Sequence, residues 1–222
     1  LTALLLVSVG NTRAGEWPGW RGPSTDMVAR DVDALEVADD VALAVSWRVP
    51  LGSGYSSVSV AHGLAVTAFS DGVDDVVIAF SATTGDELWR HPIDSTYIGH
   101  DGSQTGPIST PYVTEDLVYA LGPNGRLVAV ETANGDEVWT RDLVTDDGAN
   151  TPFYGFATSP LVVDDVLLLQ IGAGNANVVA GFDRHTGAPR WHAGDGGVQY
   201  QSPSLMRLGG ETQLVFATNS GV

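Results

Sequence analysis

One short pattern occurs three times in this chain at nearly equal intervals, and it constrains the fold more than any other feature. In each copy a tryptophan follows a glycine by four residues, after an apolar stretch. The three tryptophans are separated by 50 and 52 residues. Repeats of about 20–50 residues are typical of solenoids, propellers and arrays, in which each unit buries its apolar face against the next. The pairs are Gly85 with Trp89, Gly135 with Trp139, and Gly187 with Trp191.

Between these landmarks, each unit contains short apolar runs separated by polar turns. Runs of about five to seven residues rich in Val, Leu and Tyr, bounded by Gly, Asn or Asp, predict β-strands. Asn124 and Gly125 favour a tight hairpin turn because both residue types accept a positive φ. Residues 50–222 contain no convincing amphipathic helix pattern. In the second unit we expect strands near 108–113, 117–121, 126–131 and 137–142.

Four strands in a repeat of about 40–50 residues are typical of one blade of a β-propeller, a ring in which radial repetition protects the sheet edges. We therefore predict an all-β fold, a β-propeller of four-stranded antiparallel blades, of which about three and a half lie in this chain. Trp47 lies 42 residues before Trp89 and marks the end of an earlier unit.

The repeated glycine and tryptophan have a structural role that needs no ligand. A tryptophan ring at the end of an outer strand can fill the gap between neighbouring blades while its indole N–H reaches a backbone carbonyl. The glycine four residues earlier allows the tight turn between the third and fourth strands. We assign this blade-docking role to Gly85, Trp89, Gly135, Trp139, Gly187 and Trp191.

A second landmark is a Ser or Thr that begins the first apolar run of each unit, at Ser57, Thr110, Ser159 and Ser202. The segments just before these positions should lie closest to the propeller axis. Aromatic rings with polar tips, together with amide side chains, suit contact with a peptide or a carbohydrate. Alternatively, these side chains fill the central channel and bond to each other. The ligand-facing candidates are Tyr55, Ser56, His100, Asp101, Thr105, Tyr154, Phe156, Tyr200 and Gln201.

Composition excludes several classes of function. The chain has 27 Asp and Glu against 10 basic residues, all of them Arg, and a net charge of −17. Nucleic acid and anionic membrane surfaces are therefore poor partners, because both require clustered positive charge. The absence of Cys removes disulfides, thiolate metal sites, iron–sulfur clusters and cysteine nucleophiles.

Other constellations of chemical interest do not complete a known motif. The five His residues lack the i, i+4 helical spacing of a zinc protease, so we expect no metal site. Carboxylates at 71–75 and 146–147 lack the pattern of a calcium loop, so we interpret them as solvated turns. Residues 172–177 lack the third glycine of a dinucleotide loop, which favours a β-turn. His100 and Asp101 suit acid–base chemistry or, alternatively, a hydrogen-bonded loop pair.

The ends of the chain suggest a piece of a longer, exported protein. Residues 1–14 combine a short apolar run with a small-residue exit, which is typical of the end of a secretory signal peptide, although no basic segment precedes them. The run is too short to span a bilayer, which takes about 20 residues, so we expect no transmembrane span in the mature chain. We divide the chain into a signal-peptide remnant (1–14), an N-terminal segment with a closing strand (15–50) and a partial propeller (51–222).

The repeated Gly-x-x-x-Trp pattern resembles the pyrroloquinoline-quinone repeat, or tryptophan-docking blade, of quinoprotein-like β-propellers. Residues 17–23, Trp-Pro-Gly-Trp-Arg-Gly-Pro, and residues 54–58 further resemble the start of exported bacterial repeat proteins of the outer-membrane-assembly-lipoprotein kind. This resemblance implies eight blades in the full protein, a periplasmic or secreted location, and a non-catalytic binding or scaffold role in the cell envelope. Its implied partners are an envelope protein, a peptide or a carbohydrate.

The same resemblance also implies an alternative function, a dehydrogenase of alcohols or sugars that depends on pyrroloquinoline quinone and calcium. In those enzymes the quinone lies over the axis, calcium polarises it, an Asp acts as the base, and the alcohol dehydrogenases add a disulfide between adjacent Cys residues. This chain has no Cys, and no motif places the calcium ligands or the base. We therefore favour the non-catalytic function, with no cofactor, and assign no catalytic residue.

Overall fold

The computed structural model of this chain describes most of its length. The signal peptide predicted at residues 1–14 lies outside the described residues, as does most of the predicted turn at 172–177. The described residues are 15–29, 44–172, 177–197, 200–219 and 221.

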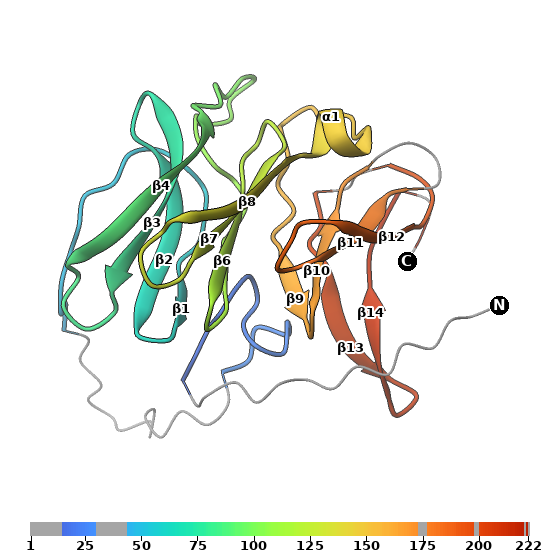
Figure 1. Cartoon of the computed structure of the whole chain (residues 1–222), viewed down its shortest axis with the longest axis horizontal. Coiled ribbons are helices and arrows are strands. Elements are labelled where there is room, and N and C mark those ends of the chain that lie inside the picture. Colours follow the sequence, from blue (N-terminus) through green and yellow to red (C-terminus); the bar gives the residue numbers. More distant parts are fainter. Residues whose placement is uncertain (1–14, 30–43, 173–176, 198–199, 220, 222) are drawn as a thin grey trace.

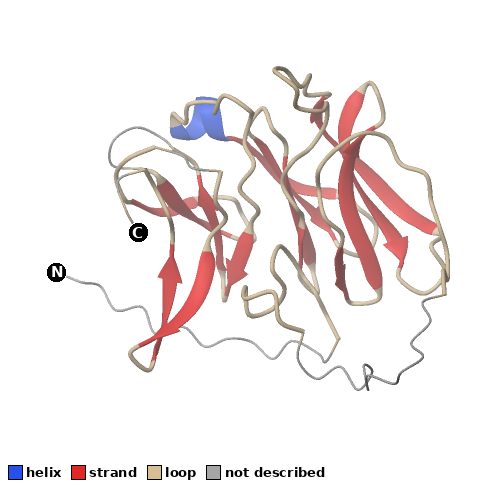
Figure 2. Cartoon of the chain, turned by 180° about the vertical axis from the view of Figure 1, so that it is seen from behind, coloured by secondary structure: helices blue, strands red, loops and turns tan. Residues whose placement is uncertain are grey.

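Three four-stranded antiparallel sheets follow one another along the chain and stand side by side as propeller blades (Figures 1 and 2). In each blade the spatial order of the strands is their order in the sequence, so every connection is a hairpin. Blade 1 contains β1 (Ser59–Ala61), β2 (Leu64–Ser70), β3 (Asp74–Ser81) and β4 (Glu87–Ser95). Blade 2 contains β5 (Tyr112–Val113), β6 (Leu117–Leu121), β7 (Arg126–Glu131) and β8 (Glu137–Asp142).

Blade 3 is followed by a two-stranded sheet that we call the C-terminal hairpin. Blade 3 contains β9 (Leu161–Val163), β10 (Val166–Gln170), β11 (Val179–Asp183) and β12 (Pro189–Ala193). The hairpin consists of β13 (Ser204–Leu208) and β14 (Glu211–Val215). The β-propeller fold predicted from the repeats is confirmed, with three whole blades and the start of a fourth.

The predicted strand boundaries of blade 2 agree closely with β6, β7 and β8, whereas the first strand is shorter than expected. Only Tyr112 and Val113 pair as β5. Pro111 has no N–H to give to a ladder, and the N–H of Thr110 donates to Ser159 Oγ of blade 3 at 3.0 Å. The backbone before Tyr112 therefore bonds to the neighbouring blade instead of its own sheet.

A short helix, α1 (Leu143–Asp147), follows β8 and was not predicted. Asp142 caps its start by accepting hydrogen bonds from the N–H groups of Val144 and Thr145, and Gly148 ends it at φ 67°. A helix of five residues is too short for apolar periodicity to reveal. No helix among the described residues has the length and apolar character to cross a bilayer.

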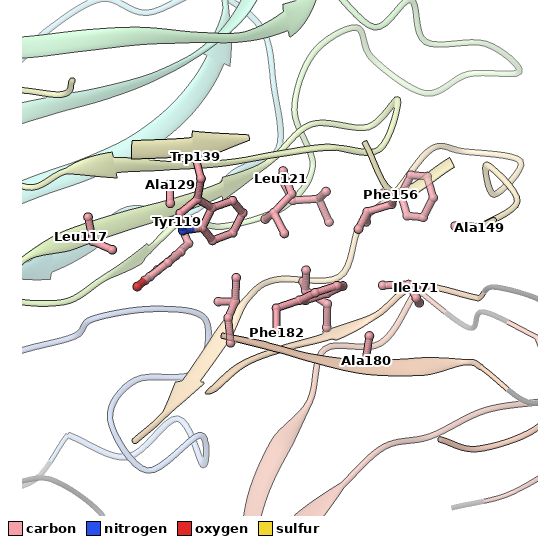
Figure 3. Close-up of a cluster of buried hydrophobic side chains, with 14 residues drawn as sticks. Leu117, Tyr119, Leu121, Ala129, Trp139, Ala149, Phe156, Ile171, Ala180 and Phe182 are labelled. Carbon is pink, nitrogen blue, oxygen red and sulfur yellow. The ribbon is translucent and has the colours of Figure 1, made fainter. Parts of the chain in front are cut away.

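The core lies between the blades rather than within any one sheet. Strands β2 and β6 are buried along their whole length, because each sheet is covered by a neighbour on both faces. One cluster joins blade 1 to blade 2, and a second joins blade 2 to blade 3. Figure 3 shows the second cluster, in which Trp139 and Leu121 of blade 2 face Phe182 of blade 3.

Candidate functional site

The repeated tryptophan is the contact between one blade and the next. The ring of Trp89 lies against Gly135 of blade 2, and its Nε1 donates to the carbonyl of Thr132 at 2.9 Å. Trp139 repeats this arrangement on Gly187 of blade 3, with Nε1 donating to the carbonyl of Arg184 at 2.9 Å. Each of these two contacts fills the space between blades and satisfies the indole N–H.

The docking glycines share a positive φ and a close approach to the indole. Gly135 has φ 77°, and a Cβ placed there would come within 2.7 Å of the Trp89 ring. Gly187 has φ 69° and would come equally close to Trp139. Only a residue without a side chain combines this backbone conformation with this proximity.

Trp47 docks on blade 1 in the same way. It lies against Gly85, and its Nε1 donates to the carbonyl of Ala82 at 3.1 Å. It also packs beside Phe80, with ring centroids 6.2 Å apart. The segment around Trp47 therefore occupies the place that an outer strand of a preceding blade would take.

Trp191 differs from the other repeat tryptophans. Its ring is partly buried against Leu161, Val163 and Leu168 of its own blade. Within residues 44–172, 177–197 and 200–219 it has no docking glycine from a following blade and no hydrogen bond from its indole N–H.

The repeated Ser and Thr residues form a hydrogen-bonded collar that links the first strands of successive blades. The N–H of Ser57 donates to Thr110 Oγ1 at 3.1 Å, and the N–H of Thr110 donates to Ser159 Oγ at 3.0 Å. The N–H of Ser159 in turn donates to Ser202 Oγ at 2.9 Å. The sequence marked these four positions, but only the structure explains why each unit needs a hydroxyl there.

Most of the aromatic candidates gather where the first strands begin, which is the end of the molecule that carries α1 (top in Figure 1). The Tyr55 hydroxyl accepts a hydrogen bond from the Gln104 N–H at 2.8 Å, and the Tyr200 hydroxyl accepts one from the Tyr154 N–H at 3.2 Å. These tyrosines therefore tie consecutive loops together. We call Tyr55, His100, Phe153, Tyr154 and Tyr200 the aromatic rim.

His100 lies at the centre of the rim. Its ring stacks on Tyr154 at 5.7 Å with an interplanar angle of 17°, and it meets Phe153 edge to face at 4.6 Å. His100 Nε2 donates to the carbonyl of Phe153 at 2.7 Å, and Nδ1 lies 3.6 Å from the carboxylate of Asp101. The hydrogen bond of the His100 ring is therefore to the Phe153 carbonyl and not to Asp101. Both interpretations of the His100–Asp101 pair stay predictions.

Sequence reasoning missed Phe153, although its side chain is 62% exposed and touches both His100 and Tyr154. Its ring meets that of Tyr154 edge to face at 4.8 Å. The available signal was an aromatic pair in an uncharged loop, of which only the second member was chosen.

Phe156 corrects the predicted site, because it does not lie on the rim. Its side chain is 1% exposed and belongs to the core between blades 2 and 3 (Figure 3). Its N–H donates to the carbonyl of Pro123, and its ring covers Gly125 in the turn between β6 and β7. The ring fills a gap between blades, so the expectation that it faces a ligand is wrong.

The remaining candidates lie beside the rim in polar loops. Ser56 Oγ donates to the Ser57 carbonyl at 3.0 Å and accepts a hydrogen bond from the Ala68 N–H at 3.3 Å. Thr105 Oγ1 accepts one from the Gly99 N–H at 3.4 Å. Asp101 and Gln201 are exposed.

A buried carboxyl group anchors the loop that carries His100. Asp75 is fully buried, and its Oδ2 accepts a hydrogen bond from the Tyr97 N–H at 3.1 Å. Burial raises the pKa of Asp75 to about 6, against the opposing effect of this hydrogen bond. Burial, followed by the nearby Tyr200, also raises the pKa of Tyr97.

The opposite end of the blades is crossed by the N-terminal segment, residues 15–29 (blue in Figure 1). Trp17 pairs with Val60 of blade 1, and the Pro18 carbonyl accepts a hydrogen bond from the Val113 N–H of blade 2 at 2.8 Å. Thr25 Oγ1 accepts one from the Leu205 N–H of the C-terminal hairpin at 2.7 Å. Residues 17–25 therefore connect the first strands at the end away from the rim.

Comparison with known proteins places the chain in a family. The family model described as outer membrane protein assembly factor BamB matches residues 73–222. Outer membrane protein assembly factor BamB of Kangiella koreensis is 28% identical over 152 residues, which are 68% of this chain and 34% of that protein. Quinohemoprotein alcohol dehydrogenase ADH IIB of Pseudomonas putida is 25% identical over 206 residues, 86% of this chain and 28% of the enzyme.

Among solved structures, BamB from Moraxella catarrhalis matches with a TM-score of 0.53 and 19% identity, over 79% of this chain and 46% of that one. The chain spans about a third of the length of the curated relatives it matches. The family match covers blades 2 and 3, the last two strands of blade 1 and the C-terminal hairpin. The chain belongs to the pyrroloquinoline-quinone-repeat β-propeller family whose model is described as outer membrane protein assembly factor BamB.

Proposed function

We propose that the protein is a non-catalytic, exported β-propeller that acts as a binding or scaffold module in the cell envelope. The family and the relative from Kangiella koreensis support an envelope role. The observation that carries the proposal is the aromatic rim, where side chains from successive loops are gathered at one end of rigid blades. Binding residues are commonly placed on loops held by such a scaffold.

The similarity to a quinohemoprotein alcohol dehydrogenase keeps one alternative in view, a quinone- and calcium-dependent oxidation of alcohols or sugars. The described residues do not fit that cofactor. They contain no group of three or more His, Cys, Asp or Glu that could hold a metal ion. Pyrroloquinoline quinone is a tricarboxylate, and the loops that carry the rim, residues 51–58, 96–109, 149–158 and 194–203, contain no Arg or Lys to pair with it. We therefore derive no catalytic step for this chain.

Chemical cross-linking of the full-length protein in intact cells, followed by affinity purification, tests the proposed role. We expect an envelope protein or an envelope polysaccharide to be recovered with it, and we expect fewer cross-links when Tyr154 is replaced by Ala. The same purified protein is mixed with pyrroloquinoline quinone, calcium and a redox dye. Alcohol- or sugar-dependent reduction of the dye would overturn the proposal in favour of the dehydrogenase.

A further inference from the structure

The four loops that lead into the first strands are almost uncharged, although the whole chain carries a net charge of −17 and the same end of the blades also carries Asp71 in the β2–β3 turn and Asp146 and Asp147 in α1. Asp101 and Asp195 are their only carboxylates, and they contain no Arg or Lys. A phosphate or carboxylate ligand would find no cation to pair with there. A strongly basic ligand would find only two separated carboxylates. The loops are residues 51–58, 96–109, 149–158 and 194–203.

The rim instead offers partly exposed aromatic rings to solvent. Phe153 is 62% exposed, Tyr55 is 49% exposed, and Tyr154 and Tyr200 are each 40% exposed. The centroids of Tyr154 and Tyr200 are 6.0 Å apart, so adjacent loops present their rings together. The C–H faces of a pyranose ring stack on such aromatic surfaces, and the polar tips of the tyrosines remain available for hydrogen bonds.

Buried polar atoms without a partner also lie at this end of the blades. Among the described residues, the Tyr97 hydroxyl, Ser109 Oγ and Gln170 Oε1 are buried and make no hydrogen bond. Tyr97 is nine-tenths buried and lies 6.4 Å, centroid to centroid, from the His100 ring at the centre of the rim. Leaving such groups unpaired is costly, so they mark places where another molecule completes the hydrogen bonding.

All three atoms belong to the rim end because of the direction of the strands. Ser109 precedes β5, and β10 runs back toward the rim and ends at Gln170. Tyr97 lies in the loop that carries His100. The buried carboxyl group of Asp75, which holds the Tyr97 N–H, has a second unpartnered oxygen at the same end, Oδ1. Hydrogen-bonding groups at the same end as partly exposed aromatic rings match a ligand that is rich in hydroxyl groups.

From this combination we infer that the aromatic rim binds a neutral oligosaccharide, with sugar rings stacked on Phe153 and Tyr154 and sugar hydroxyls bonded to Tyr97. This inference rests on the proposed binding function and specifies the chemical class of its ligand. Access is from the rim end, since residues 17–25 cross the opposite end of the blades.

Saturation-transfer NMR and affinity electrophoresis with the full-length protein test this inference. The probes are cellohexaose, maltohexaose and the fully N-acetylated chitohexaose, with a hexagalacturonate as the anionic comparison and a lysine-rich peptide as the basic one. We expect at least one neutral hexasaccharide to bind and the charged probes to bind more weakly. Absence of binding by all three neutral probes, or tighter binding of a charged probe, would overturn the inference.

Variants locate the binding surface. Phe153→Ala should weaken binding of the neutral probe about tenfold, the effect of losing one stacked ring. Tyr97→Phe removes only the hydroxyl and should weaken binding severalfold while leaving the melting temperature unchanged or higher. A merely structural Tyr97 would leave the affinity unchanged, which would contradict its assignment. Val138→Ala, at a residue 43% exposed on β8, is the matched control and should bind as the unmodified protein does.

The outcome separates this inference from the proposed function. If cross-linking recovers an envelope protein through the rim while no hexasaccharide binds, the carbohydrate assignment fails and the scaffold role stands. If a sugar binds and is oxidised with dye reduction, the proposed non-catalytic function fails instead.

Discussion

The two boundaries between whole blades differ from the boundary between blade 3 and the C-terminal hairpin. At the first two, a tryptophan lies on a glycine of the next blade and donates to its backbone at 2.9 Å. At the third, Trp191 is only partly buried, and the outward residues Met206 and Leu208 of the hairpin are 44% and 47% exposed. Of the two repeated contacts, the collar continues across this boundary among the described residues, through Ser159 and Ser202, and Leu205 and Leu214 of the hairpin pack against blade 3.

This difference shows that the collar and the tryptophan contact depend on different parts of the next unit. The collar joins the first strands and needs only one hydroxyl from the next unit. The tryptophan contact needs the turn between the third and fourth strands of the next blade, which the two-stranded hairpin lacks. Stability in such repeat folds depends on contacts between nearest neighbours, and the collar and the tryptophan contact use different parts of the next unit.

The largest expected effect separates the two kinds of boundary directly. Trp139→Ala should lower the free energy of unfolding of the full-length protein by about 3–5 kcal/mol, because it leaves a cavity between blades 2 and 3. In the 222-residue chain, where Trp191 has no docking glycine among the described residues, Trp191→Ala should have a clearly smaller effect than Trp139→Ala in the same chain. Urea denaturation measures both values, and equal losses would mean that Trp191 is docked as well.

The second prediction concerns pH and the connection from blade 1 to blade 2. The pKa of Asp75 is raised to about 6 in the folded chain, from an ordinary value of 3.8. Between these pH values the folded chain binds the proton more tightly than the unfolded chain, so the free energy of unfolding falls as pH rises from about 4 to 6. Above that range this contribution is constant.

Asp75→Asn should therefore remove a pH-dependent penalty of at most about 3 kcal/mol. We expect the variant to gain stability relative to the unmodified protein as pH rises from 4 to 7, measured by thermal denaturation. Asp101→Asn, at an exposed position, is the control and should show no such trend. Parallel pH curves for Asp75→Asn and the unmodified protein would contradict the role assigned to burial.

The third prediction separates the contribution of the docking contact to stability from that of backbone strain. Gly135 and Gly63 have almost the same φ, 77° and 78°, but only a Cβ at Gly135 would meet a ring, that of Trp89. Gly63→Ala should cost about 1–2 kcal/mol from the left-handed backbone alone. Gly135→Ala should cost a further 1–3 kcal/mol, roughly, from overpacking. Urea denaturation compares the two, and equal losses would show that the indole moves aside freely.

The smallest effect tests the collar. Ser159→Ala removes the acceptor of the buried Thr110 N–H between blades 2 and 3, which should cost about 1–2 kcal/mol. Ser202→Ala acts at the more open boundary, where water can replace the hydroxyl, and should cost less. A larger loss for Ser202→Ala would mean that the hairpin boundary is the better protected one.

The repeats made the fold predictable, because the same local pattern specifies the same blade each time. Glycine turns and apolar runs predicted the boundaries of β6, β7 and β8 closely. The predicted length of β5 was too great, because the Thr110 N–H bonds to the next blade. Contacts between units carry no local signal, and this is also why Phe156 could not be recognised as a core residue. Its burial depends on the turn at 123–125 in the preceding blade.

The rim was predictable only in part for the same physical reason. Loops that precede first strands must lie near the axis, so Tyr55, His100, Tyr154 and Tyr200 could be chosen from their position alone. The stacking of His100 on Tyr154 depends on how two loops from different blades approach each other. The spacing of residues within one loop cannot predict how closely that loop approaches a loop of another blade.

The N-terminal segment has a consequence for how the molecule is made. Arg21 donates to Ser204 Oγ across 183 positions of sequence. When synthesis has reached blade 2, the segment has its partners at Val60 and Val113 but still lacks those in the C-terminal hairpin. The contact between Arg21 and Ser204 can form only after the hairpin has left the ribosome. Contacts between residues this far apart in sequence also slow folding.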